Sequence, residues 1–230
     1  MDIYLLFALS FIPLLTVFLL FRILVPGQKI RYELWACFVG LLTLIPASFV
    51  QYYILNLPIF LANTVINLLI TAIIFNGFIE ESFKAGFMFL LPQKKLTLPV
   101  FFTCALLCGM TLGCFESVVY MIKKINAAIY PLGATALLTL MVKRMFTAVL
   151  IHTFCAGLSG LGLWMLRHKQ RHLSPFIWAI LLHGLYNYFA DFKDYFYWFS
   201  TVAILKSIQE CYDWYKYNNL SDTGVDIKRK

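Results

Sequence analysis

The chain has 230 residues, of which 61% are hydrophobic and 13% are charged, and its mean hydropathy is +0.79. A water-soluble domain of this length would need a larger polar surface, so the composition argues against that class and predicts a protein of the lipid bilayer. The formal net charge of +8 would suit a nucleic-acid-binding protein, but the basic residues lie in the connections between hydrophobic segments, which excludes that class.

Hydrophobic segments that are long enough to cross a bilayer recur along the whole chain. The first begins close to Met1 and has no cleavage site of small residues after it, so we expect it to be retained in the protein. A weaker segment at 194–211 is interrupted by Lys206. The predicted fold class is all-α, a polytopic helical membrane bundle of six to seven transmembrane helices. The six firm spans are residues 3–24, 33–54, 59–91, 97–122, 135–166 and 174–190.

The chain is expected to form a single integral membrane domain over residues 1–230, because no internal repeat or low-complexity segment divides it. Its core is expected at 59–190. The polar segment 212–230 is predicted to be a cytoplasmic tail without a fold of its own.

The third span is longer than a bilayer requires. Between Pro58 and Pro92 a helix would measure about 50 Å, against a hydrocarbon core of about 30 Å. We therefore expect this span either to tilt and protrude or to break near Asn76 and Gly77.

Basic residues are distributed unevenly among the connections. They follow the first, third and fifth spans, whereas the alternate connections are acidic or uncharged, apart from Lys123 and Lys124. Cytoplasmic loops are the ones enriched in Lys and Arg. The pattern predicts a multi-pass protein of the cell membrane with its N-terminus outside and its C-terminus in the cytoplasm.

Ionisable residues lie inside four successive spans. The third span carries Glu80, Glu81 and Lys84 at the end of a polar stripe. A charge at the centre of a bilayer costs about 2.5–3.5 kcal/mol, so these side chains must face protein or water. A salt-bridged packing cluster could explain the third span alone, and a single histidine is commonly a core residue, but four helices together predict a shared site. The other three spans contribute Glu116 with Tyr120 one turn later, His152, and His183 with Asn187 one turn later.

Distances along the helices place three of these residues at a similar depth. Counted from the nearest cytoplasmic loop, Glu80, His152 and His183 lie roughly 15–22 Å into the membrane at helical rise. Glu116 counts out deeper, nearer the outer face, so the sequence leaves open whether it belongs to the cluster.

Carboxylates and imidazoles in one place suit the hydrolysis of an amide bond. A glutamate can act as the base that activates water, and an imidazole can orient that water or donate to the oxyanion. No serine or cysteine lies in a nucleophile-elbow sequence, and no His-Glu-x-x-His zinc motif occurs. Direct attack by water without a required cofactor is therefore preferred. The alternative is a zinc ion held by Glu80, Glu81, His152 and His183.

The motifs resemble those of a known family. Glu80-Glu81-Ser-Phe-Lys84 resembles the Glu-Glu-x-x-Lys motif of the PrsW-type intramembrane proteases, which are relatives of the CAAX prenyl proteases. The segment GMTLGCFES is similar to the second motif of that family, Gly-x-x-Phe-Gly-x-x-Glu-Asn, with departures at Leu112 and Ser117. His152 matches the third motif, and His183 with Asn187 matches the fourth. The resemblance covers about residues 70–190.

The resemblance implies an intramembrane endopeptidase of the glutamic type, with a four-helix catalytic core, that cleaves a membrane-anchored protein such as an anti-sigma factor. It implies that Glu80 activates water, although the helical wheel places Glu81 nearer the centre of the polar stripe. Glu81 with Lys84 would tune that charge or act as the second carboxylate. His183 and Asn187 would form the pair that stabilises the oxyanion. His152 would orient the water or the scissile carbonyl. Glu116 and Tyr120 would be supporting residues.

Three alternatives stay open at the level of the sequence. A proton-coupled transporter could use the same buried groups as a relay, although the inverted repeats typical of many transporters are not found. A non-catalytic membrane protein could retain the cluster for packing while it binds a partner helix. A prenyl-dependent protease would need an opening as wide as a lipid.

Overall fold

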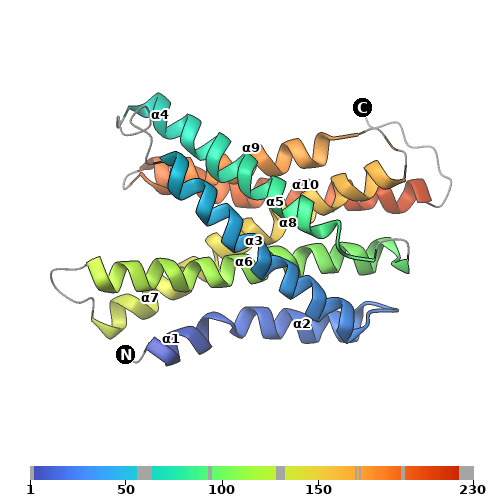
Figure 1. Cartoon of the computed structure of the whole chain (residues 1–230), viewed down its shortest axis with the longest axis horizontal. Coiled ribbons are helices and arrows are strands. Elements are labelled where there is room, and N and C mark those ends of the chain that lie inside the picture. Colours follow the sequence, from blue (N-terminus) through green and yellow to red (C-terminus); the bar gives the residue numbers. More distant parts are fainter. Residues whose placement is uncertain are drawn as a thin grey trace.

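The structure is a computed structural model that describes residues 3–55, 64–92, 95–127, 133–168, 170, 172–192 and 195–222 (Figure 1). Within these residues it is a bundle of helices without a strand, which confirms the predicted class of a helical membrane bundle. The helices are α1 (Ile3–Ser10), α2 (Ile12–Leu24), α3 (Ile30–Leu55), α4 (Val65–Ile70), the π-helix η2 (Thr71–Phe78), α5 (Ile79–Met88), α6 (Leu98–Ala127), α7 (Ala134–Met145), α8 (Ala148–Arg167), α9 (Ser174–Ala190), the short η4 (Tyr195–Tyr197) and α10 (Trp198–Asp222).

Five stretches of the described chain are long and apolar enough to cross a membrane, and they correspond to the first five predicted spans. Helix α9, the predicted sixth span, has 17 residues, which is at the lower limit of a bilayer-spanning helix. Helix α10 has 25 residues, but charged side chains such as Lys206, Glu210 and Asp213 interrupt its apolar sequence. The predicted number of six to seven crossings, and the orientation of the termini, remain predictions.

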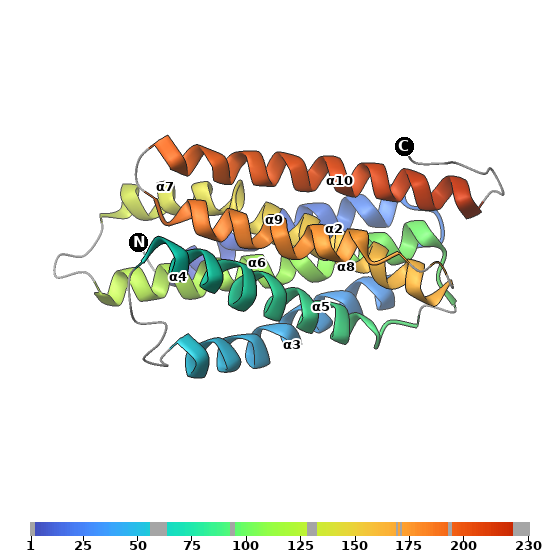
Figure 2. The ribbon, with the colours of Figure 1, turned by 90° about the horizontal axis from the view of Figure 1, so that it is seen from above.

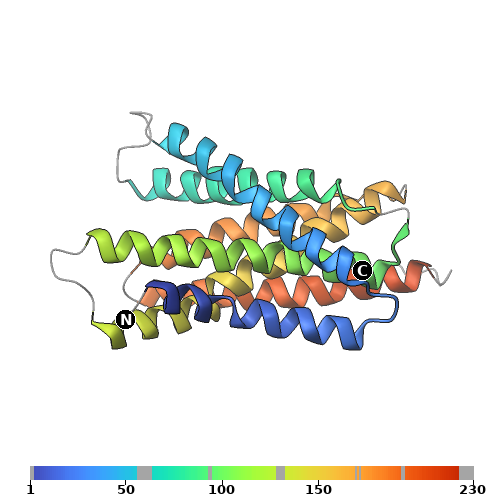
Figure 3. The same ribbon diagram turned by 60° about the horizontal axis from the view of Figure 1, so that its bottom comes forward.

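Helices α6 and α8 form the centre of the bundle. In the fourth and fifth spans, which contain α6 and α8, 83% of the apolar stretch is buried inside the bundle. In the first span only 6% is buried. Figure 3 shows α6 between the α4–α5 segment and α2, and Figure 2 shows α10 on the opposite side of the bundle from α3. The peripheral α1 and α2 therefore present most of their apolar side chains to lipid, as expected where lipid is the solvent.

Small residues allow the two central helices to approach each other closely. A Cβ atom at Gly113 of α6 would lie 2.9 Å from the Cα atom of Val149 on α8. One at Gly109 would collide with the backbone carbonyl of His152. The Gly-x-x-x-Gly pair thus brings the backbone of α6 against the turn of α8 that carries His152.

The third span does not break at Asn76 and Gly77, so this half of the prediction is wrong. The helix continues from Val65 to Met88 and widens into the π-helix η2, in which the N–H of Ile79 donates to the carbonyl of Ile74, five residues earlier. Hydrogen bonds therefore satisfy the backbone without a break, as the interior of a bilayer demands. The first residues of the predicted span, 59–63, lie outside the described part of the chain.

The fifth span was predicted as one helix, and this is also wrong. A turn at Phe146 and Thr147 divides it into α7 and α8. The turn begins two residues after Arg144, which with Lys143 forms a charged pair in a largely apolar span. It allows α7 to take its own direction, so that Arg144 can reach a carboxylate on α6.

The prediction that residues beyond 211 have no fold is wrong for 212–222. Helix α10 continues to Asp222 because its last turns still have a face that packs on the bundle. Trp214 and Asn218 are buried, and the ring of Tyr215 lies 4.8 Å from that of Phe102 on α6, measured between centroids. Residues 223–230 lie outside the described part of the chain.

Candidate active site

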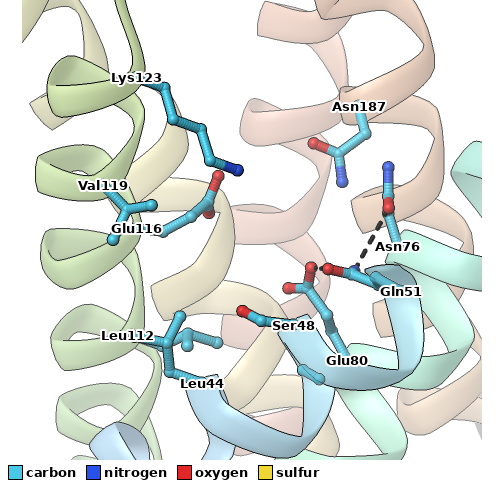
Figure 4. Close-up of a pocket in the computed structure, with 11 residues that line it drawn as sticks. Leu44, Ser48, Gln51, Asn76, Glu80, Leu112, Glu116, Val119, Lys123 and Asn187 are labelled. Carbon is cyan, nitrogen blue, oxygen red and sulfur yellow. Dashed lines mark hydrogen bonds between the residues drawn. The ribbon is translucent and has the colours of Figure 1, made fainter. Parts of the chain in front are cut away.

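A cavity of about 190 Å³ lies between α3, η2, α5, α6 and α9 (Figure 4). Its wall is mainly polar, although it lies in a bundle whose outer surface is apolar. Polar side chains from each of these elements point into it, namely Ser48, Gln51, Asn76, Glu80, Glu116, Lys123 and Asn187. The cavity is therefore a place within the membrane where water can meet ionisable side chains.

Glu81 is enclosed by three polar partners. Its Oε1 atom lies 2.6 Å from the ammonium nitrogen of Lys84 and 2.8 Å from Nδ1 of His183. Its Oε2 atom accepts a hydrogen bond of 2.7 Å from the hydroxyl of Ser159 on α8. Glu81 and Lys84 are fully buried and form an ion pair with each other. This pair matches the salt-bridged packing cluster that the sequence analysis considered as an alternative to catalysis.

Glu80, in contrast, faces the cavity. Its side chain is 15% exposed, and its Oε2 atom lies 3.6 Å from Nδ1 of His152 and 3.7 Å from Nε2 of His183. Its other oxygen, Oε1, accepts a hydrogen bond of 2.7 Å from Gln51 on α3. Of the two adjacent glutamates, only Glu80 therefore offers an oxygen to both histidines and to the cavity.

Glu116 belongs to the same cluster. Its Oε2 atom contacts Nε2 of His152, and its Oε1 atom accepts a hydrogen bond of 3.0 Å from Arg144. The guanidinium also donates to the hydroxyl of Ser117 over 3.2 Å and lies 4.2 Å from the centroid of the Tyr120 ring. The expectation that Glu116 lies at a different depth is wrong, because the close contact of α6 with α8 brings it beside His152.

The structure thus brings together Glu80, Glu81, Lys84, Glu116, His152 and His183. The two imidazole rings lie 4.6 Å apart between centroids, edge to face. Asn187, expected beside His183 as an oxyanion donor, lines the cavity together with Asn76. Tyr120 lies further out and supports Arg144 rather than the histidines.

Reasoning from the sequence missed several polar residues of the site, among them Gln51 and Arg144. Both are polar side chains inside an apolar span, which is the signal that identified Glu116 and the histidines. Gln51 was overlooked because an uncharged amide near the end of a span attracts no attention by itself. Arg144 was overlooked because its span was taken as one helix.

A second cavity, of about 200 Å³, continues from the first. The two share Asn76, Glu116 and Asn187, and the second extends to Lys143 and Asp191 beside η4. Burial raises the pKa of Asp191, which lies just beyond the end of α9. Three polar residues therefore line both cavities.

The buried histidines fit a metal site. Glu80, His152 and His183 each offer a ligand atom, and these atoms all lie within 4.8 Å of one another. Nε2 of His183 is buried and has no hydrogen-bond partner, while the Nδ1 atom of the same ring is held by Glu81. His152 has the mirror arrangement, because Glu116 contacts its Nε2 atom and leaves Nδ1 directed to Glu80. Carboxylates that hold the outer nitrogen of a ligating histidine are typical of metal centres.

This geometry changes the zinc alternative that the sequence left open. Two histidines and one carboxylate are a known ligand set of catalytic zinc, with a further position open to water. Glu81 contacts Nδ1 of His183 and is not one of the three residues whose ligand atoms lie close together. One contact competes with a metal, because the ammonium nitrogen of Lys84 lies 3.2 Å from Nδ1 of His152.

Comparison with known proteins decides between the classes that the sequence left open. The model of the PrsW family intramembrane metalloprotease matches residues 28–208, which is most of the chain. The chain belongs to the PrsW family. The resemblance seen in the motifs at 70–190 is thereby confirmed, and the PrsW match extends it to α3 and to the first half of α10. No curated protein and no solved structure matches the chain.

Membership of the PrsW family supports a multi-pass intramembrane protease that lies in the lipid bilayer and acts on a membrane-embedded substrate. It favours the protease over the transporter and the non-catalytic partner-binding protein. The PrsW family is described as a family of metalloproteases, whereas the sequence favoured a glutamic mechanism without a cofactor. The cavity and the histidine cluster are the features on which a choice between these mechanisms depends.

Proposed function

We propose that the chain hydrolyses a peptide bond of a membrane-anchored protein at the cavity beside Glu80, with Glu80, His152 and His183 as the reaction centre. The observation that carries this proposal is the convergence of these three side chains, from three different helices, on one point at the edge of a polar cavity. Peptide hydrolysis needs water at the scissile bond, and the cavity is the polar space next to these residues.

We further propose that Glu80 Oε2, His152 Nδ1 and His183 Nε2 hold a divalent metal such as zinc. When bound, such an ion supplies Lewis-acid activation of water and of the scissile carbonyl. Glu81 and Glu116 would each accept the N–H of one histidine, which would fix the tautomer and leave a lone pair on the opposite nitrogen for the metal. Asn187 and Asn76 line the same space and are suited to donate to the carbonyl oxygen of a peptide.

A metal-free mechanism is the second candidate, and the contact of Lys84 with His152 favours it. In this mechanism Glu80 Oε2 accepts a proton from the attacking water, and the proton then passes to the leaving amine. The ammonium nitrogen of Lys84 lies 3.2 Å from Nδ1 of His152, so it can donate to the nitrogen that a metal would need as a ligand. The assignment of Glu80 rather than Glu81 to the reaction is common to both candidates.

The substrate class follows from the location of the site. A peptide bond reaches a cavity inside the bundle when its own chain is anchored in the same membrane. Regulated proteolysis of an anti-sigma factor or a similar signalling protein is a proposal that rests on the resemblance of the motifs to those of PrsW proteins.

Co-expression with single-span reporter proteins tests the proposed function. The wild-type chain should shorten a reporter that carries tags on both sides of the membrane, and Glu80→Gln, His152→Gln and His183→Gln should each abolish this cleavage. The matched control is His168→Gln, because His168 lies at the end of α8 and bonds the carbonyl of Trp164. Cleavage that persists in both Glu80→Gln and His183→Gln would overturn the proposal.

A further inference from the structure

Gln51 lies four residues before the end of α3 and lines the cavity beside Glu80 and Asn76 (Figure 4). This end of α3 carries no charged residue, unlike the helices of the candidate catalytic core. Only 33% of the apolar stretch of α3 is buried inside the bundle. Leu44, Ala47 and Ser48 line the cavity from the same helix. Gln51 is thus the side chain through which α3 touches the reaction centre.

The amide nitrogen of Gln51 has three acceptors within reach, all on the opposite helix. Nε2 lies 2.7 Å from Oε1 of Glu80, 3.3 Å from the amide oxygen of Asn76 and 3.2 Å from the carbonyl oxygen of Phe75. An ionised carboxylate and a backbone carbonyl only accept hydrogen bonds, which fixes the amide with its nitrogen toward α5. The two N–H groups of Gln51 are therefore fully used in holding this segment.

Two of these acceptors, on Phe75 and Glu80, lie on successive turns of the same helical segment. Phe75 and Glu80 are five residues apart, which is the hydrogen-bonding interval of the π-helix that ends just before Glu80. One side chain thus ties the backbone at one end of a π-helical turn to the carboxylate at the other end. Gln51 of α3 thus hydrogen-bonds to both ends of the helical turn that precedes Glu80.

The two oxygens of Glu80 consequently have separate roles. Oε1 is held by Gln51, while Oε2 faces Nδ1 of His152 and Nε2 of His183. Because a carboxylate is planar, fixing one oxygen fixes the direction of the other. Loss of the bond would let the group rotate away from the histidines into the cavity.

We infer that Gln51 is a positioning residue for the reaction, which directs Oε2 of Glu80 at the two histidines and makes α3 part of the catalytic machinery. The inference rests on the proposed function and deepens it. It holds for either candidate mechanism, because both use Oε2 of Glu80. The competing role is structural, namely that Gln51 only satisfies polar groups of η2 inside the membrane.

Two variants separate these roles. Gln51→Met keeps the length and the unbranched shape of the side chain but removes the amide, and Gln51→Glu replaces the donor with an acceptor. The matched control is Gln209→Met on α10, where the exposed glutamine bonds only Lys206 among the contacts of its side chain that are described. All variants are purified as the full chain in detergent, and the reporter is the one that the wild type cleaves.

We expect kcat to fall roughly 10–100-fold in both Gln51 variants, as for other residues that orient a ligand or base, with KM within about twofold of the wild type. Gln209→Met should retain the wild-type kcat. A structural role would lower the melting temperature or raise KM without this selective loss. A kcat of Gln51→Met within about twofold of the wild type would overturn the inference.

A second readout does not depend on cleavage. The infrared carboxylate band of Glu80 is isolated as the difference between the wild type and Glu80→Gln, and it should move in Gln51→Met because a hydrogen bond to Oε1 is lost. An unchanged band would overturn the inference even if activity fell. If the wild type cleaves no reporter, the proposed function fails, while the band still decides whether Gln51 holds Glu80.

Discussion

Two adjacent glutamates of the same chemical type occupy different environments in this protein. Glu81 is buried among Lys84, Ser159 and His183, whereas Glu80 opens to the cavity and reaches both histidines. The sequence could show that both must avoid lipid, because a charged side chain that faces lipid at that depth is costly. It could not separate their roles, because the partners come from α8 and α9, about 80 and 100 positions away.

The difference between the two glutamates predicts opposite phenotypes. Glu81→Gln leaves the ammonium of Lys84 buried without its counter-charge, which should lower the free energy of unfolding by about 3–5 kcal/mol. Glu80→Gln should change that free energy by about 1 kcal/mol or less and yet abolish cleavage. Unfolding in detergent and reporter cleavage, measured on both variants, check this. The reverse pattern would assign the reaction to Glu81.

Arg144 is connected to His152 through Glu116. Its planar guanidinium bonds Glu116 and Ser117 at the same time. Arg144→Leu should reduce cleavage by roughly 10–100-fold, because the histidine loses the fixed carboxylate behind it. Arg144→Lys should recover part of the activity, since an ammonium can bond Glu116 but cannot also reach Ser117 from the same rigid plane.

Arg167 provides the control for this measurement. Like Arg144, it lies over an aromatic ring, that of Phe89, but it donates to the backbone carbonyl of Phe89 and lies at the far end of α8. Arg167→Leu should cleave the reporter at the wild-type rate. Equal losses in the two leucine variants would mean that Arg144 has no particular connection with the site.

At the scale of the elements, the crossing of η2 with α9 sets the geometry of the site. A Cβ atom at Gly77 would lie 2.5 Å from the carbonyl oxygen of Ile180, and one at Gly184 would lie 2.7 Å from the Cα atom of Ile73. This backbone contact places His183 next to the two glutamates. The order and approximate limits of the spans were predictable from hydropathy, but the π-helix was not, because its residues look like those of any apolar helix.

Gly77→Ala therefore tests whether this contact is needed. The new methyl group should force η2 and α9 apart, lower the free energy of unfolding by about 1–3 kcal/mol and reduce cleavage strongly. Gly86→Ala in α5 is the matched change, because a Cβ atom there meets nothing within 4 Å. It should raise stability by roughly 0.5–1 kcal/mol and leave cleavage unchanged. Similar behaviour of the two variants in unfolding and cleavage assays would contradict the role of the crossing.

At the scale of the whole molecule, the bundle encloses a polar cavity, and many large apolar side chains lie exposed on its outer surface. The four spans that carry ionisable residues were predicted as the catalytic core, and all four contribute to the cluster. The part played by α3 was not predicted, because Gln51 is uncharged and its place near the end of a span does not show that it contacts Glu80 on another helix. The same holds for the end of α10, whose packing face lies in a segment rich in polar residues.

The central claim is that Glu80, His152 and His183 form one metal-dependent reaction centre, and chelation tests it most directly. Purified protein is treated with a strong zinc chelator, its metal content is measured, and cleavage of the reporter is followed before and after zinc is returned. We predict that cleavage is lost with the metal and restored by zinc, and that Glu80→Gln, His152→Gln and His183→Gln no longer retain zinc. Full cleavage by protein that has been shown to contain no metal would contradict this account.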